Sequence, residues 1–200
     1  MASPNLLITG LLLLSTGLFC YTPVASEAGE DPYIIGLRNY KKQDYTHALS
    51  NWTRLASKND CDALNSLGVM YFMGQGVKKD PDKAIEYWTL ASKLGDVNAQ
   101  LILGDIYFQH TGTRFNLCVS HRCGVKQSPI SAFKWYSVAE KSAANTTVQR
   151  YASNAISFLF NYMSPEEAEI SQSLSPALQL KADKSCKSRI IKLIDYSEPI

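Results

Sequence analysis

A pattern of apolar and small residues recurs along this chain, and its period constrains the fold more than any other feature. Five residues return with a shift of 36, since Ala63, Leu67, Gly68, Tyr71 and Phe72 correspond to Ala99, Leu103, Gly104, Tyr107 and Phe108. A second set returns with the same shift, since Asp44, Ala48 and Trp52 correspond to Asp80, Ala84 and Trp88. Two helical patterns in a copy of this length are typical of a solenoid, whose helix pairs bury their faces only against neighbouring pairs. The sequence therefore predicts an all-α fold of antiparallel helix pairs.

A third copy of the second helix follows after a longer interval. Its residues return with a shift of 48, since Gly76, Val77, Lys78, Pro81, Ala84 and Ala91 correspond to Gly124, Val125, Lys126, Pro129, Ala132 and Ala139. Twelve extra residues therefore lie between Gln109 and Gly124. Asp80-Pro81 and Ser128-Pro129 predict the start of this helix in two copies, because a side-chain oxygen caps the first N–H groups and proline fits the first helical position.

The most complete copy resembles a known family, the SEL-one-like repeat, a relative of the tetratricopeptide unit. The resemblance rests on the motif Ala63-x3-Leu67-Gly68-x2-Tyr71-x2-Gly74-x-Gly76-Val77-x2-Asp80-x2-Lys83-Ala84-x3-Trp88-x2-Ala91-x3-Gly95. The resemblance extends roughly from Gly36 to Leu174, and the chain is similar to small secreted bacterial members of the family. The resemblance implies a right-handed α-solenoid with a C-terminal capping helix. It also implies a protein-interaction module, since the family has no common catalytic residues.

The repeats predict one domain behind an export signal. We expect a signal peptide at 1–26, because this stretch has no charged residue, an apolar run and a small-residue ending. A retained membrane anchor and a lipoprotein at Cys20 are the alternatives. A single solenoid is expected over 27–200, comprising an entry half-repeat 31–60, a full repeat 61–96, a full repeat with the insertion 97–144, and a degenerate terminal repeat with its cap 145–200. Such a protein would be periplasmic or secreted, and its oligomeric state stays open.

Charge argues against nucleic acid as a partner, because the net charge is only +2. Basic residues do gather late in the chain, interleaved with apolar ones: Lys181, Lys184, Lys187, Arg189, Ile190, Ile191, Lys192, Leu193 and Ile194. We interpret this stretch as the capping helix, since the ends of solenoids need a polar outer face. Binding to an anionic surface is the alternative.

Four cysteines remain beyond the predicted signal, and the nearest two are expected to pair. Cys118 and Cys123 lie together in the insertion, and an exported chain favours a disulfide between them. Cys61 and Cys186 are expected to be separated by several helices and not to pair. A redox site is an alternative use of the insertion, and so is a zinc site formed by Cys118, His121, Cys123 and His110.

Catalytic patterns are absent from the sequence, and we expect no enzyme activity and no cofactor. The function hypothesis is an exported scaffold that binds a protein or peptide through the concave face of the first helix of each pair. Helical spacing places six residues on that face: Asn65, Val69, Phe72, Leu101, Asp105 and Phe108. The alternative hypotheses are a cell-envelope enzyme acting on wall-related substrates and a redox or metal-handling protein that uses the insertion.

Overall fold

The computed structural model describes residues 29–109, 124–143, 146–174 and 186. Contacts divide the chain into two units, Met1–Glu30 and Asp31–Ile200, and every helix described belongs to the second. The described residues form eight α-helices and no strand. The helices are α1 Pro32–Lys41, α2 Tyr45–Ala56, α3 Cys61–Met73, α4 Pro81–Lys93, α5 Val97–Phe108, α6 Pro129–Ser142, α7 Thr146–Leu159 and α8 Pro165–Leu174.

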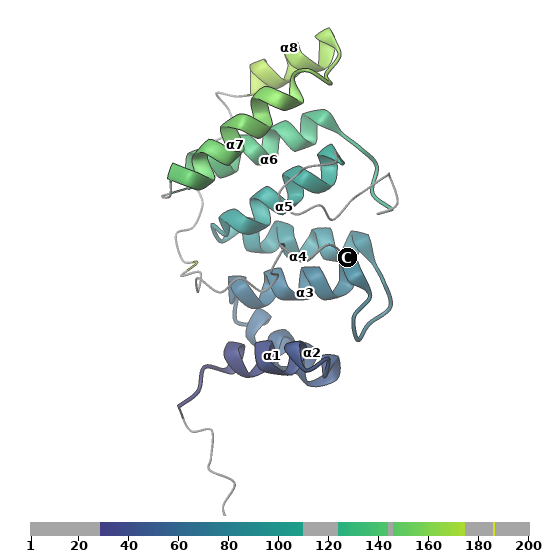
Figure 1. The fold of residues 1–200 in the computed structure, drawn as a ribbon, viewed down its shortest axis with the longest axis vertical. Helices are drawn as coiled ribbons and strands as arrows, with labels where there is room; N and C mark the ends of the chain where they lie inside the picture. Colours follow the sequence, from purple (N-terminus) through teal and green to yellow (C-terminus); the bar gives the residue numbers. More distant parts are fainter. Residues whose placement is uncertain (1–28, 110–123, 144–145, 175–185, 187–200) are drawn as a thin grey trace, which may run out of the picture. The chain divides into compact units, whose positions relative to one another are not determined.

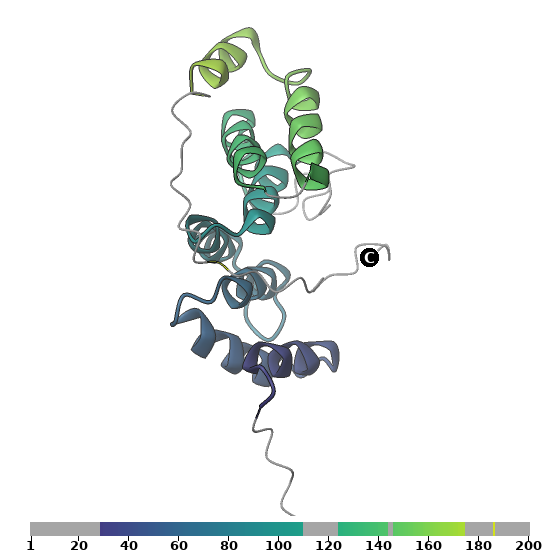
Figure 2. The same ribbon diagram turned by 90° about the vertical axis from the view of Figure 1, so that its left-hand side faces the viewer.

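The helices pack mainly against their neighbours in the chain (Figure 1). Helices α1 and α2 form an entry pair, α3 and α4 form the first full repeat, and α5 and α6 form the second. Helix α7 packs against α6, and α8 also contacts α6. The same succession is visible in the turned view of Figure 2. The predicted all-α solenoid of helix pairs is therefore confirmed.

Side-chain caps set the helix starts. The oxygens of Asp31, Asp44, Asp60, Asp80, Asp96 and Ser128 each accept a hydrogen bond from a backbone N–H in the first turn of the helix that follows. Proline occupies the first position of α1, α4 and α6, where a missing N–H leaves no bond unmade. In the turn between α3 and α4, Gly74 and Gly76 adopt φ values of 74° and 70°, which disfavour residues with a Cβ.

Each helix pair closes on a glycine that faces an aromatic ring. The three pairs are Gly36 with Trp52, Gly68 with Trp88, and Gly104 with Tyr136. A Cβ placed on any of these glycines would lie 2.5 Å from the nearest ring atom. The rings are fully buried, so the absence of a side chain at each glycine allows the two helices to approach closely.

The polar tip of each of these rings finds an acceptor on the preceding helix. Trp52 Nε1 donates to the carbonyl oxygen of Tyr33 over 3.3 Å. Trp88 Nε1 donates to Asn65, over 3.2 Å to its carbonyl oxygen and 2.8 Å to Oδ1. Tyr136 takes the place of tryptophan in the third pair and donates from its hydroxyl to a side chain. A large ring is thereby buried in each pair with its polar group satisfied.

The last of the described helices, α8, begins with a reciprocal side-chain cap. Ser164 and Glu167 form a capping box before α8, since Ser164 N–H donates to the Glu167 carboxylate over 2.9 Å and Glu167 N–H donates to Ser164 Oγ over 3.2 Å. The basic stretch predicted to form a capping helix, 181–194, lies outside the described residues apart from Cys186. Within the part of the chain described, none of the helices has the length and apolar character needed to cross a membrane.

Candidate interaction surface

The six residues predicted to line a groove do not form one. Five of them are buried, with exposed fractions between 0% and 6%: Val69, Phe72, Leu101, Asp105 and Phe108. Asn65 is half-buried and holds Trp88 through its Oδ1 and carbonyl oxygen. The expectation of an exposed groove is wrong for these positions, because it assigned only one face of α3 and α5 to the core. Ten of the 13 residues of α3 and nine of the 12 residues of α5 are buried.

Asp105 shows why one of these positions belongs to the core. Its Oδ1 accepts hydrogen bonds from the Tyr136 hydroxyl over 2.5 Å and from the Tyr151 hydroxyl over 3.1 Å. Burial and the nearby Asp105 carboxylate raise the pKa of Tyr136 above its ordinary value. The tyrosine therefore stays protonated and acts as a donor, so Asp105 joins α5 to α6 and α7 rather than a partner.

The predictions for the insertion lie outside the described residues. They concern the Cys118–Cys123 disulfide and the alternative zinc ligands His110 and His121. In the remainder of the chain that the structure describes, no cluster of three or more potential metal ligands is present.

The other two cysteines form a disulfide, with Cα atoms 5.8 Å apart. Cys186 also donates its backbone N–H to the Leu94 carbonyl oxygen over 3.2 Å. Cys186 therefore lies beside the start of α3 and the end of α4, although 125 residues separate it from Cys61 in sequence. The expectation that Cys61 and Cys186 lie far apart is wrong, because it counted the helices between them and left out a return of the chain after α8.

A buried acidic residue lies two positions after Leu94, the residue that holds Cys186. Asp96 caps α5, is 1% exposed, and leaves its Oδ2 without a hydrogen-bond partner. Desolvation raises the pKa of Asp96 to about 7, and the carboxylate of Asp62 acts in the same direction. The bonds from the N–H groups of Asn98 and Ala99 oppose this rise in pKa. The described structure therefore places a group that titrates near neutral pH inside the first two repeats.

The exposed candidate surface is the edge formed by the turns that join the first and second helices of each pair. We call it the turn edge, and it comprises Lys41–Asp44, Gly74–Lys83 and Gly124–Ser128. It carries five exposed lysines: Lys41, Lys42, Lys78, Lys79 and Lys126. Figure 1 shows the α3–α4 connection and residues 124–128 on the right-hand side of their helix pairs.

Contacts between successive turns make the turn edge continuous. The Tyr40 hydroxyl donates to Gln75 Oε1 over 2.6 Å, which joins the end of α1 to the second turn. Gly76 lies so close to Tyr45 that a Cβ there would come within 2.6 Å of the tyrosine Cβ. A Cβ on Gly124 would lie 3.4 Å from Pro81 Cγ, so the third turn borders the start of α4.

Backbone hydrogen bonds hold the second and third turns in equivalent conformations. Asp80 N–H donates to the Tyr71 carbonyl oxygen over 2.8 Å, and Ser128 N–H donates to that of Tyr107 over 3.0 Å. Gln127 Nε2 also donates to the Phe108 carbonyl oxygen over 2.9 Å. The lysines of the turn edge therefore project from fixed backbone, which lowers the entropy lost when a partner binds.

Aromatic rings accompany the lysines on the second turn. The rings of Tyr71 and Tyr87 stack with centroids 5.4 Å apart, and Lys83 Nζ lies 4.3 Å from the Tyr71 centroid. The hydrogen bond with Tyr71 is the main cause that raises the pKa of Lys83, so this amine is charged at neutral pH. Lys79 Nζ lies 5.8 Å from the Phe72 centroid. The half-exposed rings of Tyr71 and Tyr87 thus share one surface with these cations, while the Phe72 ring is buried beneath it.

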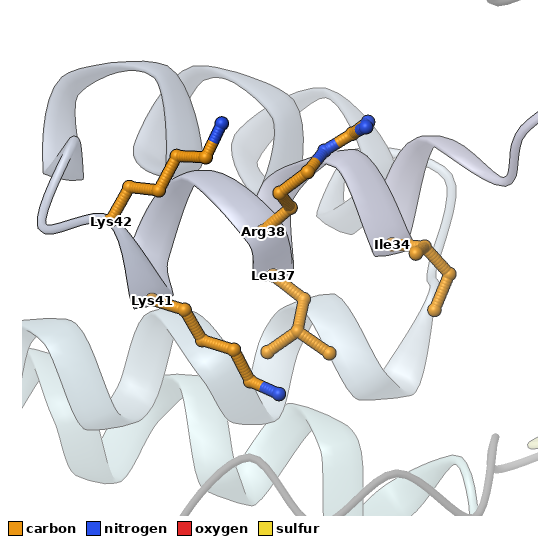
Figure 3. Close-up of a pocket in the computed structure, with 5 residues that line it drawn as sticks. All are labelled: Ile34, Leu37, Arg38, Lys41 and Lys42. Atoms are coloured by element: carbon orange, nitrogen blue, oxygen red, sulfur yellow. The ribbon is translucent and has the colours of Figure 1, made fainter.

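A shallow pocket of about 300 Å³ lies on α1 beside the first turn (Figure 3). Ile34 and Leu37 form its apolar part. Arg38, Lys41 and Lys42 complete its lining, and Lys41 lies on the same side of α1 as Ile34 and Leu37. Lys41 and Lys42 also belong to the turn edge. The pocket therefore offers an apolar contact within a cationic surface.

Sequence reasoning missed the turn edge although its signal was present. The recurrence of Gly76-Val77-Lys78 as Gly124-Val125-Lys126 was used only to align the repeats. Lys78 and Lys126 are both exposed, so their recurrence does not come from burial in the core.

Comparison with protein families agrees with this architecture. The model of the Sel1 repeat matches residues 61–96 and 97–142. The chain contains two Sel1 repeats. These matches coincide with α3–α4 and α5–α6, the pairs that carry the second and third turns of the turn edge. The resemblance noted from the sequence is thereby confirmed, and Sel1 repeats are commonly protein–protein interaction scaffolds.

Two solved structures are similar to this chain, and the first of them shows the same fold. One is the crystal structure of c5321, a protective antigen present in uropathogenic Escherichia coli strains displaying an SLR fold. It is 18% identical, with a TM-score of 0.55, over 80% of this chain and 33% of that one, so this protein spans about a third of its length. Another is a Sel1 repeat protein from Oxalobacter formigenes, which is 23% identical with a TM-score of 0.49 over 74% of this chain and 58% of that one. No curated protein matches the sequence.

Proposed function

We propose that this protein is an exported scaffold that binds another protein through the turn edge of its Sel1 repeats. The observation that carries the proposal is the row of exposed lysines on the turns, with the half-exposed rings of Tyr71 and Tyr87 beside the second turn, built on repeats that commonly bind proteins. The concave face of α3 and α5 is a poorer candidate, because the residues assigned to it are buried.

Two observations support export. Residues 1–26 have the composition of a signal peptide, with no charge and an apolar run. The Cys61–Cys186 disulfide fits an oxidising compartment, where such bonds form and persist. Both favour the periplasm or the extracellular space.

Export is tested by fusing residues 1–30 to a reporter that folds only in an oxidising compartment. An active reporter is the expected result, and replacing Leu11, Leu12 and Leu13 with arginine is the matched control that should abolish it. A reporter that stays inactive with the unmodified segment would contradict export.

Partner binding is tested by affinity capture with the chain from residue 27 as bait. Proteins of the envelope or medium should be recovered by the unmodified bait and lost from a bait that carries Lys78→Glu and Lys79→Glu. A bait with Lys93→Glu and Lys58→Glu has the same net charge as the Lys78→Glu, Lys79→Glu bait and serves as the control. Recovery that is equal with all three baits would contradict the turn edge as the binding surface.

A further inference from the structure

We propose that the turn edge recognises an extended, acidic peptide segment that also carries apolar side chains. The inference rests on the proposed function and names the chemistry of its partner. It starts from three exposed lysines that lie just before helix starts: Lys78, Lys79 and Lys126.

Lysines elsewhere in the repeats have a structural reason. Lys58, Lys93 and Lys141 lie at the carboxyl ends of α2, α4 and α6, where a cation interacts favourably with the helix dipole.

The lysines of the second and third turns lie at the amino ends of α4 and α6, the opposite ends of the helix dipoles. Lys78 and Lys79 directly precede Asp80, the N-cap of α4, and Lys126 precedes Ser128, the N-cap of α6. A positive charge near a helix N-terminus is unfavourable by a few tenths of a kcal/mol. Three exposed cations at such positions therefore indicate a ligand that is negatively charged.

Acidic side chains on the turn edge distinguish between ligands. Asp44 is engaged by His47, whose Nδ1 lies 2.7 Å from its carboxylate. Asp80 accepts a hydrogen bond from the Lys83 N–H over 3.0 Å. Burial is the main cause that raises the pKa of Tyr107, and the charge of the exposed Asp82 adds to it, so Asp82 lies near this ring. Negative charges interleaved with the lysines would repel a uniformly anionic membrane. A peptide can place its carboxylates opposite the lysines and neutral residues opposite these aspartates.

The rings give the second part of the specificity. The stacked Tyr71 and Tyr87 are half-exposed beside Lys83, and the pocket on α1 presents Ile34 and Leu37 beside Lys41. Apolar or aromatic side chains next to the partner's carboxylates would find these contacts.

The spacing of the turns defines the length of the segment. Packed helices lie about 8–10 Å apart, so turns that recur every second helix lie about 16–20 Å apart. An extended peptide rises about 3.3 Å per residue, so five or six residues separate carboxylates that meet neighbouring turns. The three turns of the described chain enclose two such intervals, so about 10–12 residues span them and a 15-residue segment extends past both outer turns.

The test uses a fluorescein-labelled 15-residue peptide of Gly, Ser and Tyr with Glu pairs at every fifth position. Anisotropy with the chain from residue 27 should show saturable binding that weakens as salt is raised. A matched peptide with Gln in place of Glu should bind at least about tenfold more weakly. Equal binding of the two peptides, or binding of neither, would overturn the inference.

Two matched variants each remove three charges, one from the turn edge and the other from the carboxyl ends of α2, α4 and α6. The triple variant Lys78→Gln, Lys79→Gln and Lys126→Gln should lose about tenfold in affinity for the Glu peptide, while its melting temperature stays the same or rises, because an unfavourable dipole interaction is removed. The control triple variant Lys58→Gln, Lys93→Gln and Lys141→Gln should bind the peptide within about twofold of the unmodified protein. Equal losses in both variants would show nonspecific attraction and would overturn the inference.

A vesicle arm separates the peptide from a lipid surface. Vesicles with 30% phosphatidylserine should not co-sediment the protein at a salt concentration where the Glu peptide binds. Co-sedimentation without peptide binding would overturn the inference in favour of a membrane. If affinity capture yields a partner that both triple variants retain, the acidic-peptide inference fails while the scaffold function stands.

Discussion

At the scale of single residues, the repeats depend on the contact between a glycine and an aromatic ring. The three glycines lack any side chain, and each faces the ring of the next helix at a distance that a Cβ would make too short. Gly68 and Gly104 recur in the sequence with the 36-residue shift, and the close approach explains that recurrence. The sequence did not predict the hydrogen bond from Tyr136 to Asp105. The tyrosine hydroxyl reaches the carboxylate of Asp105, whereas the indole N–H of Trp88 in the preceding repeat donates to Asn65.

The glycine contact makes a direct prediction. Gly68→Leu should lower the free energy of unfolding by about 1–3 kcal/mol or more, because the added atoms meet the buried ring of Trp88. Thermal and urea unfolding measure the change. Ser50→Leu adds the same side chain at an exposed position of α2 and is the control, with an effect within about 0.5 kcal/mol. Equal stability of Gly68→Leu and the unmodified protein would contradict close packing at this glycine.

The buried Asp96 predicts a pH dependence. Its pKa is raised from 3.8 to about 7 in the folded state, so between these values the folded protein binds more protons than the unfolded chain. The contribution of Asp96 to stability is therefore complete below about pH 4 and is lost as the pH rises through 7. Asp96→Asn keeps a good N-cap and removes the charge.

We expect Asp96→Asn to gain stability relative to the unmodified protein as the pH rises from 5 to 8, by on the order of 1–3 kcal/mol. Urea unfolding at several pH values measures the difference. Asp82→Asn makes the same change at an exposed position of α4 and serves as the control. A difference between Asp96→Asn and the unmodified protein that stays constant with pH would show that Asp96 ionises normally.

At the scale of helices, the sequence predicted the elements well because their starts are encoded locally. Asp80-Pro81 and Ser128-Pro129 each precede a helix at the expected residue, and the Ser164–Glu167 box shows the same local control at the start of α8. Burial was predicted less well. Helical spacing divides a helix into faces, yet it does not tell how many of those faces neighbouring segments cover, so α3 and α5 were assigned an exposed face that the structure does not have.

The caps make a prediction for one helix. Asp80→Ala should destabilise the protein by about 1 kcal/mol, because the N–H of Lys83 loses its acceptor. Asp82→Ala, which removes a first-turn acid that does not cap, should cost about 0.3 kcal/mol and is the matched control. Unfolding in urea measures both, and a larger effect for Asp82→Ala would show that charge rather than capping determines the start of α4.

At the scale of the whole molecule, the disulfide is the longest-range tie among the described residues. It links the first full repeat to Cys186, beyond α8, and Leu94 holds the same residue through its carbonyl oxygen. No local pattern reports which distant segment returns to a given helix, which is why the pairing escaped prediction. The insertion offered a nearer pair of cysteines, and that pairing stays a prediction.

The disulfide should stabilise the fold substantially. Cys61→Ser with Cys186→Ser is expected to lower the free energy of unfolding by about 2–4 kcal/mol, since the bond restricts a long stretch of the unfolded chain. Cys118→Ser with Cys123→Ser is the comparison and should cost less, because its loop is short. Equal melting of the Cys61–Cys186 variant and the oxidised protein would contradict the bond, and peptide mapping by mass spectrometry identifies the pairs directly.

The central claim is that this protein binds a protein partner through the turn edge, and site-specific photo-crosslinking in the native host tests it most directly. A benzophenone side chain replaces Lys79 in one strain and Lys93, on the opposite edge, in another. The account predicts a discrete crosslinked adduct of higher mass from position 79 and none from position 93. Adducts formed only from position 93, or from neither position in cells that export the folded protein, would contradict it.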